Sequence, residues 1–214
     1  IDGDTATNCG GAAPELPWKI NYDVQKEISR TDDVEAEPGV WTPDGNGGNS
    51  IWGRAAIDPS NHAWHGNDAG IHSDTWLVSP DLKVSANTWF AMSFRHRFSF
   101  EFDSSMPPTQ YFDGGVIELS EDGGMTWKDA MAYGTTPPYV AKVAEGDVAL
   151  TGQLAFVGQS NNWPFFDTVN LNFTDKFAGK TIKVRFRIAT DQKNGQGQFF
   201  GWDIDDIAFD GIDN

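Results

Sequence analysis

The sequence is poor in cysteine, in long apolar runs and in positive charge, and each shortage excludes a class of protein. Cys9 is the only cysteine in 214 residues, so no disulfide can form within the chain. No apolar run is long enough to cross a bilayer, and no signal peptide is recognisable. Fifteen lysines and arginines stand against 31 aspartates and glutamates, and the net charge is −16. A surface of this sign repels a phosphate backbone, which argues against nucleic acid as a partner.

Turn-forming and aromatic residues are, by contrast, abundant. The chain has 23 glycines, 11 prolines and nine tryptophans, and few stretches of the composition that forms long helices. We therefore expect an arm or linker over residues 1–15 and a single β-sandwich domain over residues 16–214. The start at Ile1, without methionine, predicts a processed fragment whose export signal was removed upstream, and hence a secreted or cell-surface protein.

Alternation of apolar and polar residues marks the strands. The clearest case is residues 180–189, where Ile182, Val184, Phe186 and Ile188 fall on one face. Further strands are predicted at 18–22, 40–41, 50–57, 74–82, 88–100, 115–120, 125–128, 153–157, 168–173 and 200–209. Many strands at short spacing, without alternating helices, predict an all-β, antiparallel, jelly-roll-like β-sandwich.

Residues 120–127 fit the spacing Ser-x-Asp-x-Gly-x-x-Trp, the pattern called an Asp box. The pattern, which begins at Ser120, predicts a β-hairpin corner in which the Asp122 carboxylate folds back onto backbone N–H groups of the turn. Gly124, with the glycine before it, supplies the positive φ angles of the corner, and Trp127 folds over it. The pattern identifies a turn and not a reaction.

Several segments, in order, resemble the MAM-like jelly-roll modules of secreted proteins. The resemblance covers about residues 74–211 and rests on residues 76–82, 92–98, 113–120, 179–188 and 201–207. An Asp box followed by a terminal Ile-Asp-Asp-Ile strand is also similar to a reelin-type subrepeat. The cysteines that brace animal MAM modules are absent here.

The resemblance implies which domains stand beside the module and which cation it binds. Modules of this kind lie beside catalytic domains in secreted bacterial metalloproteases and in surface-anchored proteins. Many such jelly rolls hold a calcium ion between the C-terminal strand and an early segment, and the matching positions are Asp205 and Asp206.

Chemistry makes the same pair a candidate. Adjacent carboxylates in an apolar strand cannot both point outward unless a bulge displaces one, and a buried one needs a cation or hydrogen-bond donors. We expect Ca²⁺, while backbone N–H groups or an arginine such as Arg95, Arg97 or Arg185 are the alternative. A second group, Glu101, Asp103, Asp113 and Glu118, is read equally as a cation site or as solvated charge.

No catalytic residue is predicted. His62, His65 and His72 lack the His-Glu-x-x-His pattern, and a zinc site built from them is rejected. The nucleophile pattern Gly-x-Ser-x-Gly is missing. A glycosidase pair among Glu101, Glu118 and Glu121 stays open, because their separation is invisible in a sequence.

Aromatic residues in polar, glycine-rich surroundings are the candidate ligand-binding residues. They are Trp41, Trp52, Trp64, Trp163, Phe165 and Phe166. Exposed rings of this kind suit the faces of sugars, but wide loops can also fold such rings back over the sandwich, which we expect for most of them.

These features predict a non-catalytic extracellular accessory or adhesion module, stabilised by calcium, that binds glycan or protein. One alternative is a fragment or accessory domain of a secreted metallopeptidase. Another is a calcium-stiffened spacer of a surface protein.

Overall fold

The computed structural model describes residues 31–37, 39–46, 51–68, 70–105, 107–192 and 199–213. The predicted arm, the predicted strand at 18–22 and Cys9 lie outside the described residues. Strands make up nearly all the regular structure of the described part, with a short 3-10 helix, η2 (Ala130–Tyr133), after β11. No helix in these ranges is long and apolar enough to span a membrane.

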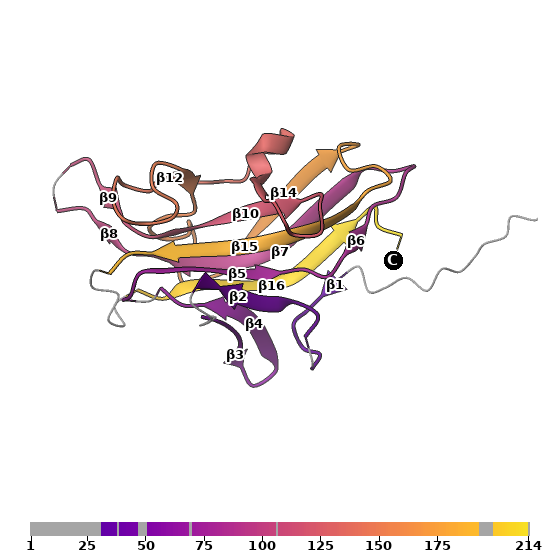
Figure 1. The fold of residues 1–214 in the computed structure, drawn as a ribbon. Coiled ribbons are helices and arrows are strands. Elements are labelled where there is room, and N and C mark those ends of the chain that lie inside the picture. Colours follow the sequence, from indigo (N-terminus) through magenta and orange to yellow (C-terminus); the bar gives the residue numbers. More distant parts are fainter. Residues whose placement is uncertain are drawn as a thin grey trace, which may run out of the picture.

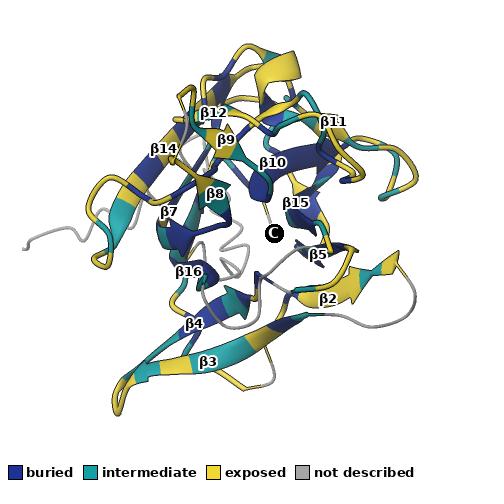
Figure 2. Ribbon diagram, turned by 90° about the vertical axis from the view of Figure 1, so that its left-hand side faces the viewer, coloured by how far each residue is buried: buried dark blue, intermediate teal, exposed yellow. Residues whose placement is uncertain are grey.

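Two large antiparallel sheets pack face to face (Figures 1 and 2). The first has the order β14 (Asp167–Thr174), β7 (Phe90–Ser99), β16 (Gly201–Asp210), β4 (Asn61–Gly66) and β3 (Trp52–Asp58), with β1 (Thr31–Asp32) also paired to β16. The second has the order β11 (Lys128–Asp129), β10 (Gly114–Ser120), β15 (Thr181–Thr190), β5 (Ser73–Val78) and β2 (Thr42–Gly45), with β6 (Leu82–Lys83) paired to β15. Two small pairs join β8 (Phe102–Asp103) to β9 (Gln110–Tyr111), and β12 (Ala141–Lys142) to β13 (Leu154–Ala155). The predicted antiparallel β-sandwich is confirmed.

The core lies between the sheets, where each strand turns alternate residues inward. Strand β14 shows the period of two, with Val169, Leu171 and Phe173 buried between exposed neighbours. Trp202 of β16 is fully buried at the centre, with its ring 5.3 Å from that of Phe156. Figure 2 shows the buried residues concentrated on the strands that face each other.

The corner predicted between residues 120 and 127 is present. Strands β10 and β11 pair antiparallel on either side of it. Asp122 Oδ1 accepts the backbone N–H of Thr126 at 2.9 Å, and its Oδ2 accepts the Thr126 hydroxyl at 2.6 Å. Ser120 Oγ accepts the N–H of Gly124, whose φ is 99°, and the indole N–H of Trp127 donates to the Gly124 carbonyl at 3.0 Å. These bonds hold the pKa of Asp122 at about 2, with the Thr126 hydroxyl as the largest cause.

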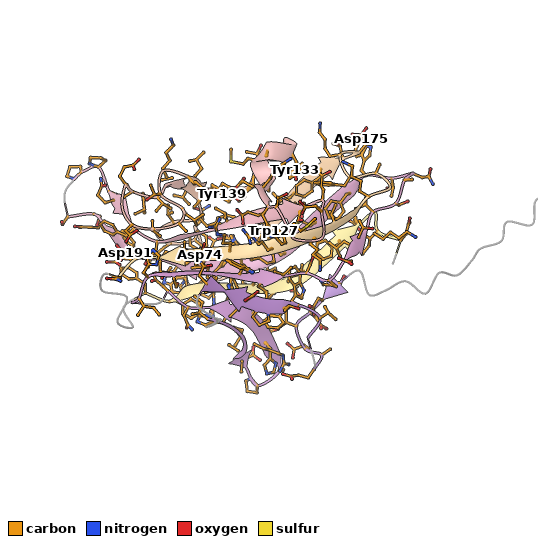
Figure 3. All side chains as sticks on the ribbon, viewed as in Figure 1. Asp74, Trp127, Tyr133, Tyr139, Asp175 and Asp191 are labelled. Atoms are coloured by element: carbon orange, nitrogen blue, oxygen red, sulfur yellow. The ribbon has the colours of Figure 1, made fainter. Side chains whose placement is uncertain are left out.

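A charged network covers the outer face of the second sheet. Glu118 accepts Arg185 Nε at 2.6 Å and Arg187 Nη1 at 3.1 Å, and Arg187 forms a two-pronged pair with Asp74. The Arg185 guanidinium also lies over the ring of Trp127, at 4.5 Å from its centroid. Figure 3 shows Trp127 beside the middle of β15.

Candidate functional site

An aromatic loop lies across the outer face of the first sheet. It connects residues 158 and 167 and carries Trp163, Phe165 and Phe166. Strand β7 holds it in place through the guanidinium groups of Arg95 and Arg97, which lie 5.1 and 4.9 Å from the centroid of the Phe166 ring. Such contacts contribute about 0.5–1 kcal/mol each at exposed positions.

The loop is ordered by its own hydrogen bonds. The backbone N–H of Phe165 donates to the Asn162 carbonyl at 2.7 Å, and that of Trp163 to the Ser160 carbonyl at 3.0 Å. The Asn162 side chain and backbone N–H both donate to the carboxylate of Asp167, at the start of β14. The tip is therefore preorganised, and binding there would cost little conformational entropy.

This ordered tip leaves one ring almost fully in solvent. Phe165 is 74% exposed, whereas Trp163 and Phe166 are half-buried. The Trp163 ring lies 5.1 Å from that of Phe200, just before β16, which joins it to the sheet. We call Trp163, Phe165, Phe166 and Phe200, with Arg95 and Arg97, the aromatic surface.

A buried carboxylate anchors the surface from below. Asp203 of β16 is 1% exposed and bonds the guanidinium of Arg97 at 2.8 Å and His65 Nδ1 at 2.7 Å. The Phe200 ring packs against His65, with ring centroids 4.8 Å apart. Arg97 and Phe200 are thus held in place by side chains of the strands beneath them.

A small cavity adjoins the same loop. It measures about 140 Å³, and its lining includes Ser160, Asn161 and Asp167 from the loop and His96 and Phe156 from the core. Burial lowers the pKa of His96 to about 4, and its Nδ1 accepts the indole N–H of Trp202 at 3.2 Å.

The prediction of an exposed, ligand-binding ring is wrong for three tryptophans. Trp41, Trp52 and Trp64 all belong to the buried core. The Trp41 ring packs 5.4 Å from that of Phe186, and Trp64 lies on β4 with its side chain inward. Their glycine-rich surroundings are short strands and turns that carry the rings over the sheets, where burial of a large ring is most favourable.

A second candidate site lies at one end of the sandwich. One ligand oxygen from each of Glu101, Asp113 and Asp191 lies within 4.8 Å of the others, the only such group of His, Cys, Asp and Glu in the described ranges. Asp68 is the fourth member, because its carboxyl interacts directly with that of Asp113. Figure 3 places Asp191 at the end where β8 and β9 lie in Figure 1. Burial, reinforced by the charge of Asp68, raises the pKa of Asp113 to about 9.

The sequence predicted half of this second site. Glu101 and Asp113 are brought together as expected, while Asp68 and Asp191 were missed. Asp103 is exposed and accepts the backbone N–H of Ser105 at 2.7 Å, outside the group. Asp68 and Asp191 could have been found by their positions, because both lie just beyond the end of a strand, β4 and β15 respectively.

The Asp205–Asp206 pair lies on a β-bulge, which is one of the two arrangements that the adjacency of the carboxylates left open. Asp205 is buried and accepts Asn61 Nδ2 at 3.1 Å and the Asp206 backbone N–H at 2.8 Å. Asp206, with a φ of 48°, turns outward and pairs with Arg95 at 3.2 Å. These contacts correspond to the N–H and arginine alternative, and calcium binding at this pair stays a prediction.

The other candidate side chains have separate partners. His62 bonds Glu35 at 2.8 Å, His65 bonds Asp203, and His72 lines a cavity of about 240 Å³. The three imidazoles therefore do not share a partner. Glu121 pairs with Lys180 at 2.5 Å.

Comparisons with protein-family models and with curated proteins found no match. Among solved structures, TmCBM61 in complex with β-1,4-galactotriose is 12% identical, with 80% of this chain and 88% of that chain covered and a TM-score of 0.43. The K3 cleaved adhesin domain of Lys-gingipain from Porphyromonas gingivalis is 16% identical, with 84% and 97% covered and a TM-score of 0.43. A carbohydrate-binding module of Cellvibrio mixtus lichenase 5A, in complex with cellotriose, is 12% identical, with 84% and 95% covered and a TM-score of 0.37. At these values the similarities assign neither a family nor a function to the chain.

Proposed function

We propose that the chain is a non-catalytic, extracellular glycan-binding module and that the aromatic surface is its binding site. The observation that carries the proposal is the 74% exposed ring of Phe165 at the tip of a loop with its own hydrogen bonds. A mobile tip would cost entropy to immobilise, whereas the backbone that carries this ring is already held by hydrogen bonds.

The surroundings of the ring fit a sugar. A pyranose has an apolar C–H face and an edge of hydroxyl groups, so it needs a ring beside hydrogen-bonding groups. Phe165 and Trp163 supply rings, Asn161 of the same loop lines the adjoining cavity, and the Arg95 guanidinium lies 5.1 Å from the centroid of the Phe166 ring. The 140 Å³ cavity beside the loop could admit part of a sugar unit or a substituent.

The acidic side chains support a role in binding over a role in hydrolysis. Glu118 is held between two arginines, and Glu121 is paired with Lys180. A glycosidase needs two carboxyl groups about 5–10 Å apart in an open cleft, with one free to act as an acid. Glu118 and Glu121 are instead held by structural ion pairs.

Affinity electrophoresis through gels containing plant, algal and bacterial polysaccharides tests the proposal. We expect retardation in at least one gel, and loss of that retardation in Trp163→Ala and Phe165→Ala. Trp89→Ala is the matched control, because Trp89 is 63% exposed and lies in a different turn. Retardation lost equally in the Trp89 variant, or retained in both loop variants, would place the site elsewhere.

A further inference from the structure

Four strand ends from both sheets bring carboxylates to one point. Asp68 follows β4 and Glu101 follows β7 in the first sheet, whereas Asp113 precedes β10 and Asp191 follows β15 in the second. The β8–β9 hairpin connects Glu101 to Asp113 and fixes their spacing, because the N–H of Phe112 donates to the Glu101 carbonyl at 3.1 Å. The fold thus gathers four acidic groups that are far apart in the sequence.

Two of these carboxylates are braced by the backbone of the other two. The Glu101 N–H donates to Asp68 Oδ2 at 2.8 Å, and the Asp191 N–H donates to Asp113 Oδ1 at 2.8 Å. Each bond uses one oxygen of the accepting carboxylate and fixes the direction of the other. The group is therefore rigid before any ligand arrives.

The second oxygen of each braced carboxylate is buried without an N–H or hydroxyl donor, because the carboxyls of Asp68 and Asp113 lie against each other. Asp68 and Asp113 are 5% and 1% exposed, and neither Asp68 Oδ1 nor Asp113 Oδ2 has a hydrogen-bond donor among the described residues. Leaving a buried acceptor unsatisfied is costly, and more so for a charged one, so two such oxygens together favour a bound proton or a cation between them.

The geometry points to a calcium ion, and we propose that Asp68, Glu101, Asp113 and Asp191 bind Ca²⁺ between the two sheets. Calcium takes oxygen ligands at about 2.3–2.6 Å, so oxygens on opposite sides of one ion lie about 4.6–5.2 Å apart. Three of the four residues already hold their oxygens within 4.8 Å of one another. The donor set is entirely oxygen, which favours a hard cation over zinc or copper.

The bound ion would tie the ends of β4, β7, β10 and β15 together. It would neutralise charge where like carboxylates repel, in a chain of net charge −16. The site is distinct from the Asp205–Asp206 pair, whose carboxylates bond Asn61 and Arg95.

Isothermal titration calorimetry of the EDTA-treated chain with CaCl₂, together with thermal unfolding, tests this site. We expect Ca²⁺ to bind and to raise the melting temperature of the wild-type chain. Asp113→Asn and Asp191→Asn should each weaken Ca²⁺ binding by at least about tenfold, since even indirect partners of a metal contribute 10–100-fold. Asp103→Asn is the matched control, because Asp103 is exposed and lies outside the group, and it should leave binding within about threefold of wild type.

The melting temperature of Asp113→Asn, compared with wild type in EDTA and in Ca²⁺, separates a cation site from ordinary hydrogen bonding. Asparagine at position 113 still accepts the Asp191 N–H, but it cannot ionise, so the folded chain no longer has to bury a charge or take up a proton there. In EDTA, Asp113→Asn should therefore melt above the wild-type chain, and in Ca²⁺ it should lose that advantage. Absence of Ca²⁺ binding to the wild type, or full binding by both Asp113→Asn and Asp191→Asn, would overturn the proposal. If Asp113→Asn does not fold, the half-buried Asp191 decides the question.

Discussion

Removing the Glu118 side chain should destabilise the sandwich more than breaking a surface ion pair does. The side chains of Glu118 and Arg185 are only 8% and 9% exposed, and their closest atoms lie 2.6 Å apart. Glu118→Ala leaves the Arg185 guanidinium buried without that counter-charge. Breaking one partner of a buried pair costs about 3–5 kcal/mol of unfolding free energy. Arg187 keeps its pair with Asp74, so we expect the lower half of that range.

Urea unfolding at pH 7 measures this loss, with an unchanged m-value as evidence of two-state unfolding. The double variant Glu118→Leu with Arg185→Met should recover most of the lost stability, because apolar replacement of a buried pair is often neutral. Glu121→Ala is the matched surface control, since the Glu121–Lys180 pair is half-exposed and should cost less than about 1 kcal/mol. A loss below about 1 kcal/mol for Glu118→Ala would refute the claim that this network is shielded from solvent.

Three further predictions concern the turn, the core and pH. Asp122→Ala should lower the melting temperature at pH 7. Because the folded pKa of Asp122, about 2, lies below the ordinary 3.8, the difference in melting temperature between wild type and variant should narrow as pH falls from 4 to 2. A difference that stays constant over this pH range would contradict the prediction. Gly115→Ala should cost about 1–3 kcal/mol in urea unfolding, because its Cβ would lie 2.5 Å from the Trp202 ring, whereas Gly53→Ala, with open space around it, should be nearly neutral. The folded pKa of His96, about 4, lies below the ordinary 6.5, so the unfolded chain takes up a proton first and stability should fall as pH drops from 6.5 to 4. The slope should reach at most about 1.4 kcal/mol per pH unit, and His96→Gln, measured by the same unfolding, should show a shallower one.

The strands with strong one-faced alternation could be predicted from the sequence. In strand β15 the sequence alternates apolar and polar residues up to Ile188 because one face lies on the core, and residues 180–189 were predicted almost to the residue. Strand β4 was missed, because its six residues Asn61–Gly66 are polar and end in glycine. Trp64 is its single large apolar residue that points inward, and one such residue does not establish an alternation with a period of two.

The sites were harder to predict because they depend on contacts between distant segments. Asp68 and Asp191 are separated by most of the chain and meet only because β4 and β15 end at the same edge of the sandwich. Phe200 joined the aromatic surface unpredicted, since a residue at the start of a strand gives no sign of which loop will cover it. The bulge at Asp205 was predictable, because adjacent carboxylates in an apolar strand conflict with regular alternation.

A crystal structure of the chain with an oligosaccharide from a polysaccharide that retards it in gels would locate the glycan site itself. We expect a sugar ring stacked on Phe165 or Trp163, at van der Waals contact of about 4 Å, with its hydroxyl groups toward Asn161 or Arg95. A sugar bound to the exposed Trp89, or over the outer face of the second sheet with the 158–167 loop unoccupied, would contradict this expectation.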